Sequence, residues 1–443
     1  MSKLLSEAQG SEAPVADGGR AARTAFATCL LVCLVVALPA GEFPRLDADA
    51  EAGRLIAQGR LDEVPKPFAN RLLHPLLAGL LARSGVTDID GAFVFLALVA
   101  LVILAGAVVT LAAESGVQPY VVVVLAAGPY LISTFEQAYL ADLFHAAGLA
   151  ILLLCLRHDR LGLGLLVLAA LVTVRESTVL FGAVLVLLAW RRGQRTFGSL
   201  AGGSTLLGLG VVAFLSRHSL PNIHNLPDWL YMMLKVPFNV AKNLFGVVPW
   251  ANTLGYAAAW HIQLPGWARV GSVTEVGLAP WDPVRPLMTL CLYLTLFGVA
   301  PTALVFVMRV WHSKSREDAS RPRLPLVIEC AVIYGTVAFV IGPALGDWVS
   351  RLIGYGWPAF WIGVPALGAR ALRVSRERLL LLLVLQQVAT WSGWVALNLF
   401  RSATPGLALT FALAIVMHVL TWRTLVSAQQ THGWARGENG PVR

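Results

Sequence analysis

The chain has 443 residues, of which 57% are apolar and only 13% are charged. A soluble domain of this length needs more polar surface than this composition provides, so the sequence predicts a polytopic membrane protein. The formal net charge of +9 is explained by arginine-rich connections between apolar segments and by lipid-facing surface, so membrane lipid is an expected partner and nucleic acid is not.

Twelve apolar segments, two of them short, are candidates for membrane-spanning helices. A helix needs about 20 apolar residues to cross the hydrocarbon layer. The segments are 24–40, 90–113, 118–134, 139–156, 161–174, 177–190, 198–215, 287–308, 324–344, 352–369, 379–399 and 407–423. The predicted fold class is therefore all-α, a polytopic transmembrane helical bundle with about 12 spans.

Basic residues in the short connections predict the orientation of this bundle. Arginine and lysine precede the first segment and recur near 157–160, 191–195, 314–323 and 370–378. With twelve spans, all of these connections lie on one face, which the positive-inside rule assigns to the cytoplasm. Both termini of a multi-pass plasma-membrane protein are therefore expected in the cytoplasm.

The remaining chain divides into two tails, a membrane module and two long outer loops. Residues 1–22 and 424–443 are polar and poor in large apolar residues, which predicts disordered cytoplasmic tails. The transmembrane module covers 23–423, and its outer loops are 42–89 and 216–286. The outer face is therefore expected to hold most of the ordered extramembrane chain.

Each outer loop contains a segment that predicts a helix lying in the membrane interface. Arg71 to Arg83 has leucines at helical spacing between basic ends, and the second loop contains the amphipathic stretch HNLPDWLYMMLKVPFNVAKNLFG. The first of these helices is either a simple strut or part of a site at the membrane surface. In the second case Arg71 and His74 are candidate substrate-binding residues.

Two aspartates stand just past the first predicted span. Asp47 and Asp49 lie in the polar stretch between Glu42 and Asn70, close to the mouth of the first helix. A carboxylate in this place needs a chemical or structural reason.

Arg175 and Glu176 interrupt an otherwise apolar run from Leu161 to Trp190 that has arginines at both ends. If both ends are cytoplasmic, the chain turns near Arg175, and each arm of roughly 14 residues rises only about 21 Å. Because the hydrocarbon core is roughly 30 Å thick, both residues are expected below the outer surface, at the floor of a water-filled or protein-lined cavity. Ionisable groups at this depth are usually functional. The alternative is a structural ion pair capping two half-helices, and the pair can do both.

Three more ionisable residues lie near the outer ends of predicted spans. Arg351, in GDWVSRLIGYGWP, can hold a phosphate through charge-assisted hydrogen bonds while Tyr355 and Trp357 anchor in the headgroup layer. The alternative is a salt bridge to Asp347 in an interfacial belt. Asp142 and His145 share a helical face at positions i and i+3 and are candidate substrate-binding residues. Packed polar groups are a more common outcome in such a place than metal ligands.

Several local patterns together resemble the GT-C superfamily of bacterial membrane glycosyltransferases, which use polyprenyl-phosphate-linked sugars. Their order along the chain and their predicted sidedness both agree with that family. The patterns are Leu46-Asp47-Ala48-Asp49 followed by Arg54-Leu55-Ile56-Ala57, then PFANRLLHPLLAGLL, LVTVRESTVLF and the arginine of GDWVSRLIGYGWP.

The resemblance implies an inverting transferase that moves one sugar from a polyprenyl-phosphate donor to a glycan, lipid or protein acceptor on the outer face. It implies that Asp49, or else Asp47, is the general base, and that Arg175 and Arg351 stabilise the leaving phosphate. Many members have an aromatic residue where this chain has Gly53, and no second acidic pair follows the first loop. A divalent metal is therefore not supported, and no cofactor is expected.

Two other classes of protein remain open from the sequence. A transporter or flippase for a lipid-linked or small polar substrate would use the same buried charges along its pathway. Against it, no internal repeat relates two halves of the chain, and the two outer loops are unequal. In a non-catalytic assembly subunit, the aspartates of the first loop would be ordinary loop charges.

Overall fold

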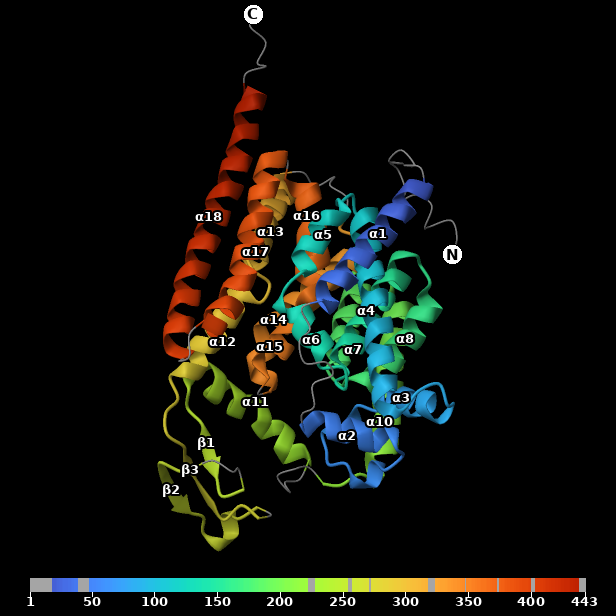
Figure 1. Ribbon diagram of the computed structural model, residues 1–443, viewed down its shortest axis with the longest axis vertical. Helices are drawn as coiled ribbons and strands as arrows, with labels where there is room; N and C mark the ends of the chain where they lie inside the picture. Colours follow the sequence, from blue (N-terminus) through green and yellow to red (C-terminus); the bar gives the residue numbers. More distant parts are fainter. Residues whose placement is uncertain are drawn as a thin grey trace, which may run out of the picture.

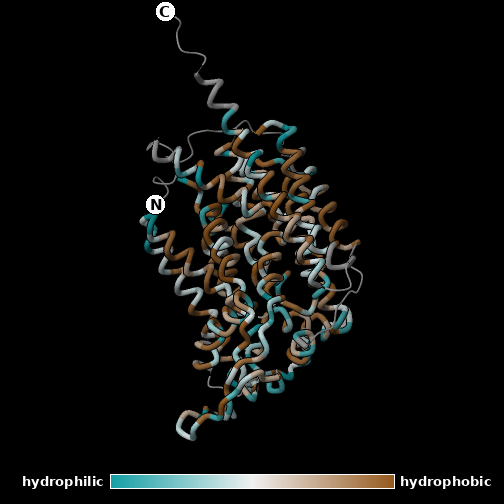
Figure 2. The backbone as a smooth tube through the Cα atoms, turned by 90° about the vertical axis from the view of Figure 1, so that its left-hand side faces the viewer, coloured by the Kyte–Doolittle hydropathy of each residue, from teal (hydrophilic) through white to brown (hydrophobic). Residues whose placement is uncertain are grey.

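The protein is a predominantly helical bundle in a computed structural model (Figure 1). Hydrophobic residues line most of the length of its helices, and hydrophilic residues gather toward the ends (Figure 2). The structure describes residues 18–38, 48–221, 228–253, 257–270, 272–317, 323–346, 348–372, 374–399 and 403–437.

Each predicted apolar segment coincides with one helix or with consecutive short helices. In the first half these are α1 (Gly18–Ala37), α4 (Ile89–Glu114), α5 (Pro119–Ala126), α6 (Pro129–Glu136), α7 (Asp142–Arg157), α8 (Leu161–Val174), α9 (Thr178–Arg191) and α10 (Arg195–Leu215). In the second half they are α12 (Val284–Thr295), α13 (Ala300–Glu317), α14 (Leu326–Leu345), α15 (Val349–Gly354), the π-helical η7 (Pro358–Gly363), α16 (Val364–Ala371), α17 (Arg376–Leu399) and α18 (Ala403–Gly437).

Within the described residues, five helices are long and apolar enough to cross a membrane. The number is seven if two bent pairs each count as one span: α5 with α6, bent by 65°, and α12 with α13, bent by 60°. The other apolar helices are shorter, including α8 and α9, which have 14 residues each. Helix length and composition therefore agree with a membrane protein but give fewer spans than the twelve that the sequence predicts.

Two glutamines of α17 form hydrogen bonds with backbone groups at the two bends. Gln386 donates to the carbonyl of Phe297 and accepts from the amide of Val299, at 3.1 and 3.0 Å, between α12 and α13. Gln387 donates to the carbonyl of Val124 in α5. Because backbone groups inside a membrane need a partner, these glutamines stabilise the two breaks.

The non-spanning elements gather at the lower end of the bundle in Figure 1, where α18 begins. In the first loop these are α2 (Ala48–Ala57), the 3-10 turns η3 (Leu61–Glu63) and η4 (Phe68–Asn70), and α3 (Leu73–Arg83); in the second they are η5 (Ser216–His218), α11 (Asp228–Phe245) and η6 (Gly266–Ala268). Both predicted loop helices, α3 and α11, are therefore present. The site lies beside α2 and α3.

The second loop also contains a small antiparallel sheet that the all-α prediction omits. Its order is β1–β3–β2, with β1 (Pro249–Ala251), β2 (Trp260–Gln263) and β3 (Glu275–Leu278). Pro249 pairs with Leu278, and Trp260 pairs with the same residue from the other side. Strands of three or four residues are too short to show a period-2 pattern in the sequence.

The predicted C-terminal tail differs from the structure. Helix α18 continues through the first part of 424–443 and ends at Gly437. Leu425 and Ala428 are buried, so packing extends this helix beyond the apolar segment. Most of the predicted N-terminal tail, residues 1–17, lies outside the described residues, while the rest of 1–22 begins α1.

Candidate functional site

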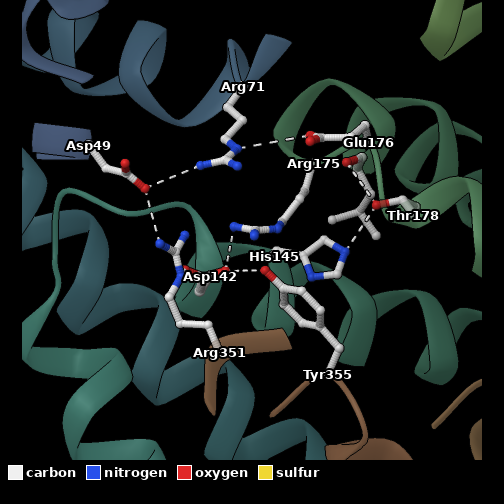
Figure 3. Close-up of polar contacts among 10 residues, drawn as sticks. Asp49, Arg71, Asp142, His145, Arg175, Glu176, Thr178, Arg351 and Tyr355 are labelled. Carbon is white, nitrogen blue, oxygen red and sulfur yellow. Dashed lines mark hydrogen bonds and ion pairs between the residues drawn. The ribbon is translucent and has the colours of Figure 1, made fainter. Parts of the chain in front are cut away.

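Side chains from distant parts of the chain meet in one polar cluster beside α2 and α3 (Figure 3). Most of the residues that the sequence analysis selects are in it. Its charged members are Asp49, Arg71, Asp142, Arg175, Glu176 and Arg351, and we call these six residues the charge cluster. Tyr355, His145 and Thr178 complete the surroundings.

Asp49 lies in the first turn of α2 and contacts two guanidinium groups. Its Oδ2 accepts from Arg351 Nη1 at 3.0 Å and from Arg71 Nη1 at 3.5 Å. Arg71 lies between η4 and α3, and Arg351 lies in α15, so one oxygen of α2 links the first loop to the bundle. The Asp49 side chain is 17% exposed, so this end of the charge cluster is open to solvent.

Asp142, at the start of α7, forms the buried end of the charge cluster. Its carboxylate accepts from Arg175 Nη1 at 2.5 Å and from the Tyr355 hydroxyl, and it lies 2.7 Å from Arg351 Nε. The Asp142 side chain is only 4% exposed. Arg351 therefore bridges a buried carboxylate and a more exposed one, Asp49.

The predicted turn between two short arms is confirmed, but the partners of Arg175 and Glu176 differ from expectation. Arg175 follows α8 with extended backbone, and its guanidinium packs 4.8 Å from the ring of Tyr355. Glu176 lies 3.9 Å from Arg71 Nε. Instead of forming the ion pair with each other that the structural alternative predicts, Glu176 contacts Arg71 and Arg175 pairs with Asp142, where protein encloses it.

The two histidines selected from the sequence are both buried. His145 Nε2 lies 3.0 Å from the hydroxyl of Thr178, which also donates to the carbonyl of Leu171. His74 packs between the rings of Phe93 and Phe144, each with its centroid 5.2 Å away. His145 therefore supports the α8–α9 turn, whereas His74 belongs to the packing of α3.

The burial of His74 predicts a pH dependence of stability. Burial lowers the pKa of His74 to about 4, below the ordinary value of about 6.5. Between these values the unfolded chain binds a proton that the folded chain does not, so acidification destabilises the fold by up to about 1.4 kcal/mol per pH unit. We expect His74→Gln to reduce the fall in the thermal unfolding midpoint between pH 7.5 and 5.5.

The matched control for this measurement is His218→Gln, because His218 is exposed in η5. This variant should keep the full pH dependence of the unmodified protein. Equal pH dependence in the two variants would contradict the prediction.

The predicted surroundings of Tyr355 and Trp357 are wrong. Tyr355 and Trp357 were expected in the headgroup layer, but they are 2% and 0% exposed. Tyr355 packs against His145 and Arg175, and Trp357 packs against Trp361 of η7. The signal was available in the spacing, since Tyr355 follows Arg351 by four residues and so lies on the same helical face. Asp47 and Asp347 lie outside the described residues.

The charge cluster pairs three carboxylates with three guanidinium groups. Buried charges persist in proteins only when they are paired in this way. Among the described residues, Arg351 Nη2 and Arg71 Nε are buried atoms without a hydrogen-bond partner. Both belong to the guanidiniums around Asp49, so this end of the charge cluster has donors left for an anionic oxygen.

Comparisons with family models, curated proteins and solved structures found no match to this chain. Among the residues that the structure describes, no group of three or more His, Cys, Asp or Glu side chains is placed to hold a metal ion.

Proposed function

We propose that the chain is an integral membrane glycosyltransferase of the GT-C type. It moves one sugar, with inversion, from a polyprenyl-phosphate-linked donor to a glycan, lipid or protein acceptor on the extracytoplasmic face. The observation that carries the proposal is the contact of Asp49 with both Arg351 and Arg71. A partly exposed carboxylate beside two guanidiniums supplies both a base and the cations for a leaving phosphate.

The chemistry requires one proton transfer and one bond exchange. Asp49 takes the proton of the acceptor hydroxyl while the oxygen of that hydroxyl attacks the anomeric carbon of the sugar. The bond between that carbon and the phosphate oxygen breaks, and the polyprenyl phosphate leaves with the electron pair. A positioned base contributes about 10²–10⁴-fold, and Arg351 and Arg71 stabilise the charge that develops on the phosphate.

For the topology, we infer twelve crossings with both termini in the cytoplasm. Support comes from the two 14-residue arms around Arg175 and from the two bent pairs, each of which counts as one crossing. We expect Gly59→Cys to react with a membrane-impermeant maleimide in intact cells, and Arg191→Cys to react only after the cells are permeabilised. Both positions are exposed, and the unmodified protein is the control. Labelling of both from the same side would contradict the topology.

A second candidate function is transport of a lipid-linked or small polar substrate. The bent pairs α5–α6 and α12–α13 favour it, because transporters bind substrates at broken helices. However, Gln386 and Gln387 already engage backbone groups at these breaks. The carbonyls and amides that would otherwise coordinate a substrate there are thus partly used.

The two functions are separated by an assay on purified protein in detergent, where transport cannot be scored. Sugar transfer from labelled polyprenyl-phosphate donors to an acceptor extract from the cell envelope supports the glycosyltransferase. Donor flux in sealed proteoliposomes without any sugar transfer would support the transporter and overturn our proposal.

A further inference from the structure

We propose that Asp49 and the phosphate of the substrate compete for the same two arginines. In the unliganded protein Asp49 holds Arg71 and Arg351, and a bound phosphate displaces its carboxylate from both. That the phosphate belongs to a polyprenyl lipid rests on the proposed function, whereas the exchange itself rests on the contacts of the charge cluster.

The six side chains of the charge cluster balance one another in charge. Its ion pairs join Asp49, Asp142 and Glu176 to Arg71, Arg175 and Arg351, which gives equal numbers of negative and positive groups. A cluster balanced in this way has no surplus positive charge for an anion. An incoming phosphate therefore binds well only if one carboxylate gives up its arginines.

Asp49 is the carboxylate that a phosphate can displace. Asp142 is 4% exposed and contacts three donors, so an anion cannot reach it or replace it. Glu176 is more accessible, but its ion pair among the described residues is with Arg71 alone, at 3.9 Å. Asp49 alone among the three joins two guanidiniums of the open end. Displacing Asp49 frees both at once.

The guanidinium groups of Arg351 and Arg71 have hydrogen-bond donors that Asp49 does not use. Arg351 Nη1 and Arg71 Nη1 both meet Asp49 Oδ2, and the neighbouring atoms Arg351 Nη2 and Arg71 Nε have no hydrogen-bond partner among the described residues. Asp49 thus uses one donor on each side with a single oxygen. A phosphate has more oxygens and can engage both guanidiniums more completely, since arginine binds phosphate through paired donors.

The exchange couples donor binding to the release of the base. Asp49 becomes free to accept the acceptor's proton only after the phosphate has replaced it as the partner of Arg71 and Arg351. During transfer Asp49 gains that proton and loses its negative charge, while the departing phosphate gains one negative charge. The total charge beside Arg71 and Arg351 therefore stays constant through the reaction.

The test is binding of a short-chain polyprenyl phosphate to detergent-purified protein by isothermal titration calorimetry. We expect Asp49→Asn to bind at least about fivefold more tightly than the unmodified protein, because the competing charge is gone. Asp49→Ser is a second neutral variant, in case the first folds poorly. Arg71→Gln and Arg351→Gln should each weaken binding by at least about tenfold.

Asp90→Asn is the matched control, because Asp90 also pairs with an arginine of α2, Arg54, at 3.1 Å, but lies outside the charge cluster. Its affinity should equal that of the unmodified protein. Inorganic phosphate and the uncharged polyprenol separate the contributions of headgroup and chain: tightening by Asp49→Asn should appear with both phosphates and not with the alcohol.

Unchanged or weaker phosphate binding in both neutral Asp49 variants would overturn the exchange, as would the absence of phosphate binding in every variant. The outcome is independent of the enzymatic proposal. Tighter phosphate binding without any sugar transfer would support the exchange and contradict the glycosyltransferase proposal. Sugar transfer that needs Asp49, without tighter binding in the Asp49 variants, would support the glycosyltransferase and contradict the exchange.

Discussion

Asp49→Asn is expected to reduce sugar transfer by at least about 10²-fold while leaving membrane insertion normal. The asparagine keeps the size of the side chain and can still accept from Arg351 and Arg71 through its carbonyl oxygen, but it cannot take a proton from the acceptor. The rate of transfer from a labelled polyprenyl-phosphate donor, at saturating donor, measures the effect. Saturation matters because the same variant is expected to bind the lipid phosphate more tightly.

The controls decide which carboxylate is the base. Asp47→Asn is expected to have a milder effect. Asp90→Asn, which removes the pair of Asp90 with Arg54 outside the charge cluster, should leave transfer unchanged. If Asp47→Asn loses activity and Asp49→Asn keeps it, the base is Asp47. If both variants remain active, the proposed mechanism is wrong.

The sequence was informative about the helices and about which residues gather. Hydrophobic segments and flanking charges located the helical elements of the bundle, because apolar length and basic connections are local properties of the chain. The depth argument correctly predicted a turn at Arg175 between two 14-residue arms. Asp49, Arg175 and Arg351 do meet in one cluster, since each was selected as a charge close to the same end of the bundle.

The pairing within the cluster could not be predicted in this way. Whether Arg175 faces Glu176 or Asp142 depends on how α7 packs against the α8–α9 turn, and neither local spacing nor composition reports that packing. The burial of Tyr355 similarly depends on contacts with Asp142, His145 and Arg175, which come from distant parts of the chain. The small sheet was missed because its strands are short and its pairing joins segments separated by a long connection.

The buried pair of Asp142 and Arg175 is expected to give the largest effects on stability. Their side chains are 4% and 5% exposed and lie 2.5 Å apart. Removing one partner of such a pair leaves an uncompensated charge, which typically costs about 3–5 kcal/mol. We therefore expect Asp142→Asn and Arg175→Met each to lower the free energy of unfolding by this amount, measured by denaturant titration in detergent.

The double variant distinguishes a direct pair from two independent losses. Because Asp142→Asn already removes the charge that Arg175 neutralises, the combined loss should be smaller than the sum of the single losses. Additive losses would contradict the pairing.

The binding titration then separates support of the fold from contact with the substrate. Arg175 is enclosed by Asp142 and Tyr355, so the folded fraction of Arg175→Met should bind the polyprenyl phosphate within about twofold of the unmodified protein. Arg351→Gln should lose that affinity, because Arg351 also reaches Asp49 at the open end. A loss of affinity in Arg175→Met with unchanged stability would instead show that Arg175 contacts the phosphate, as the sequence predicts.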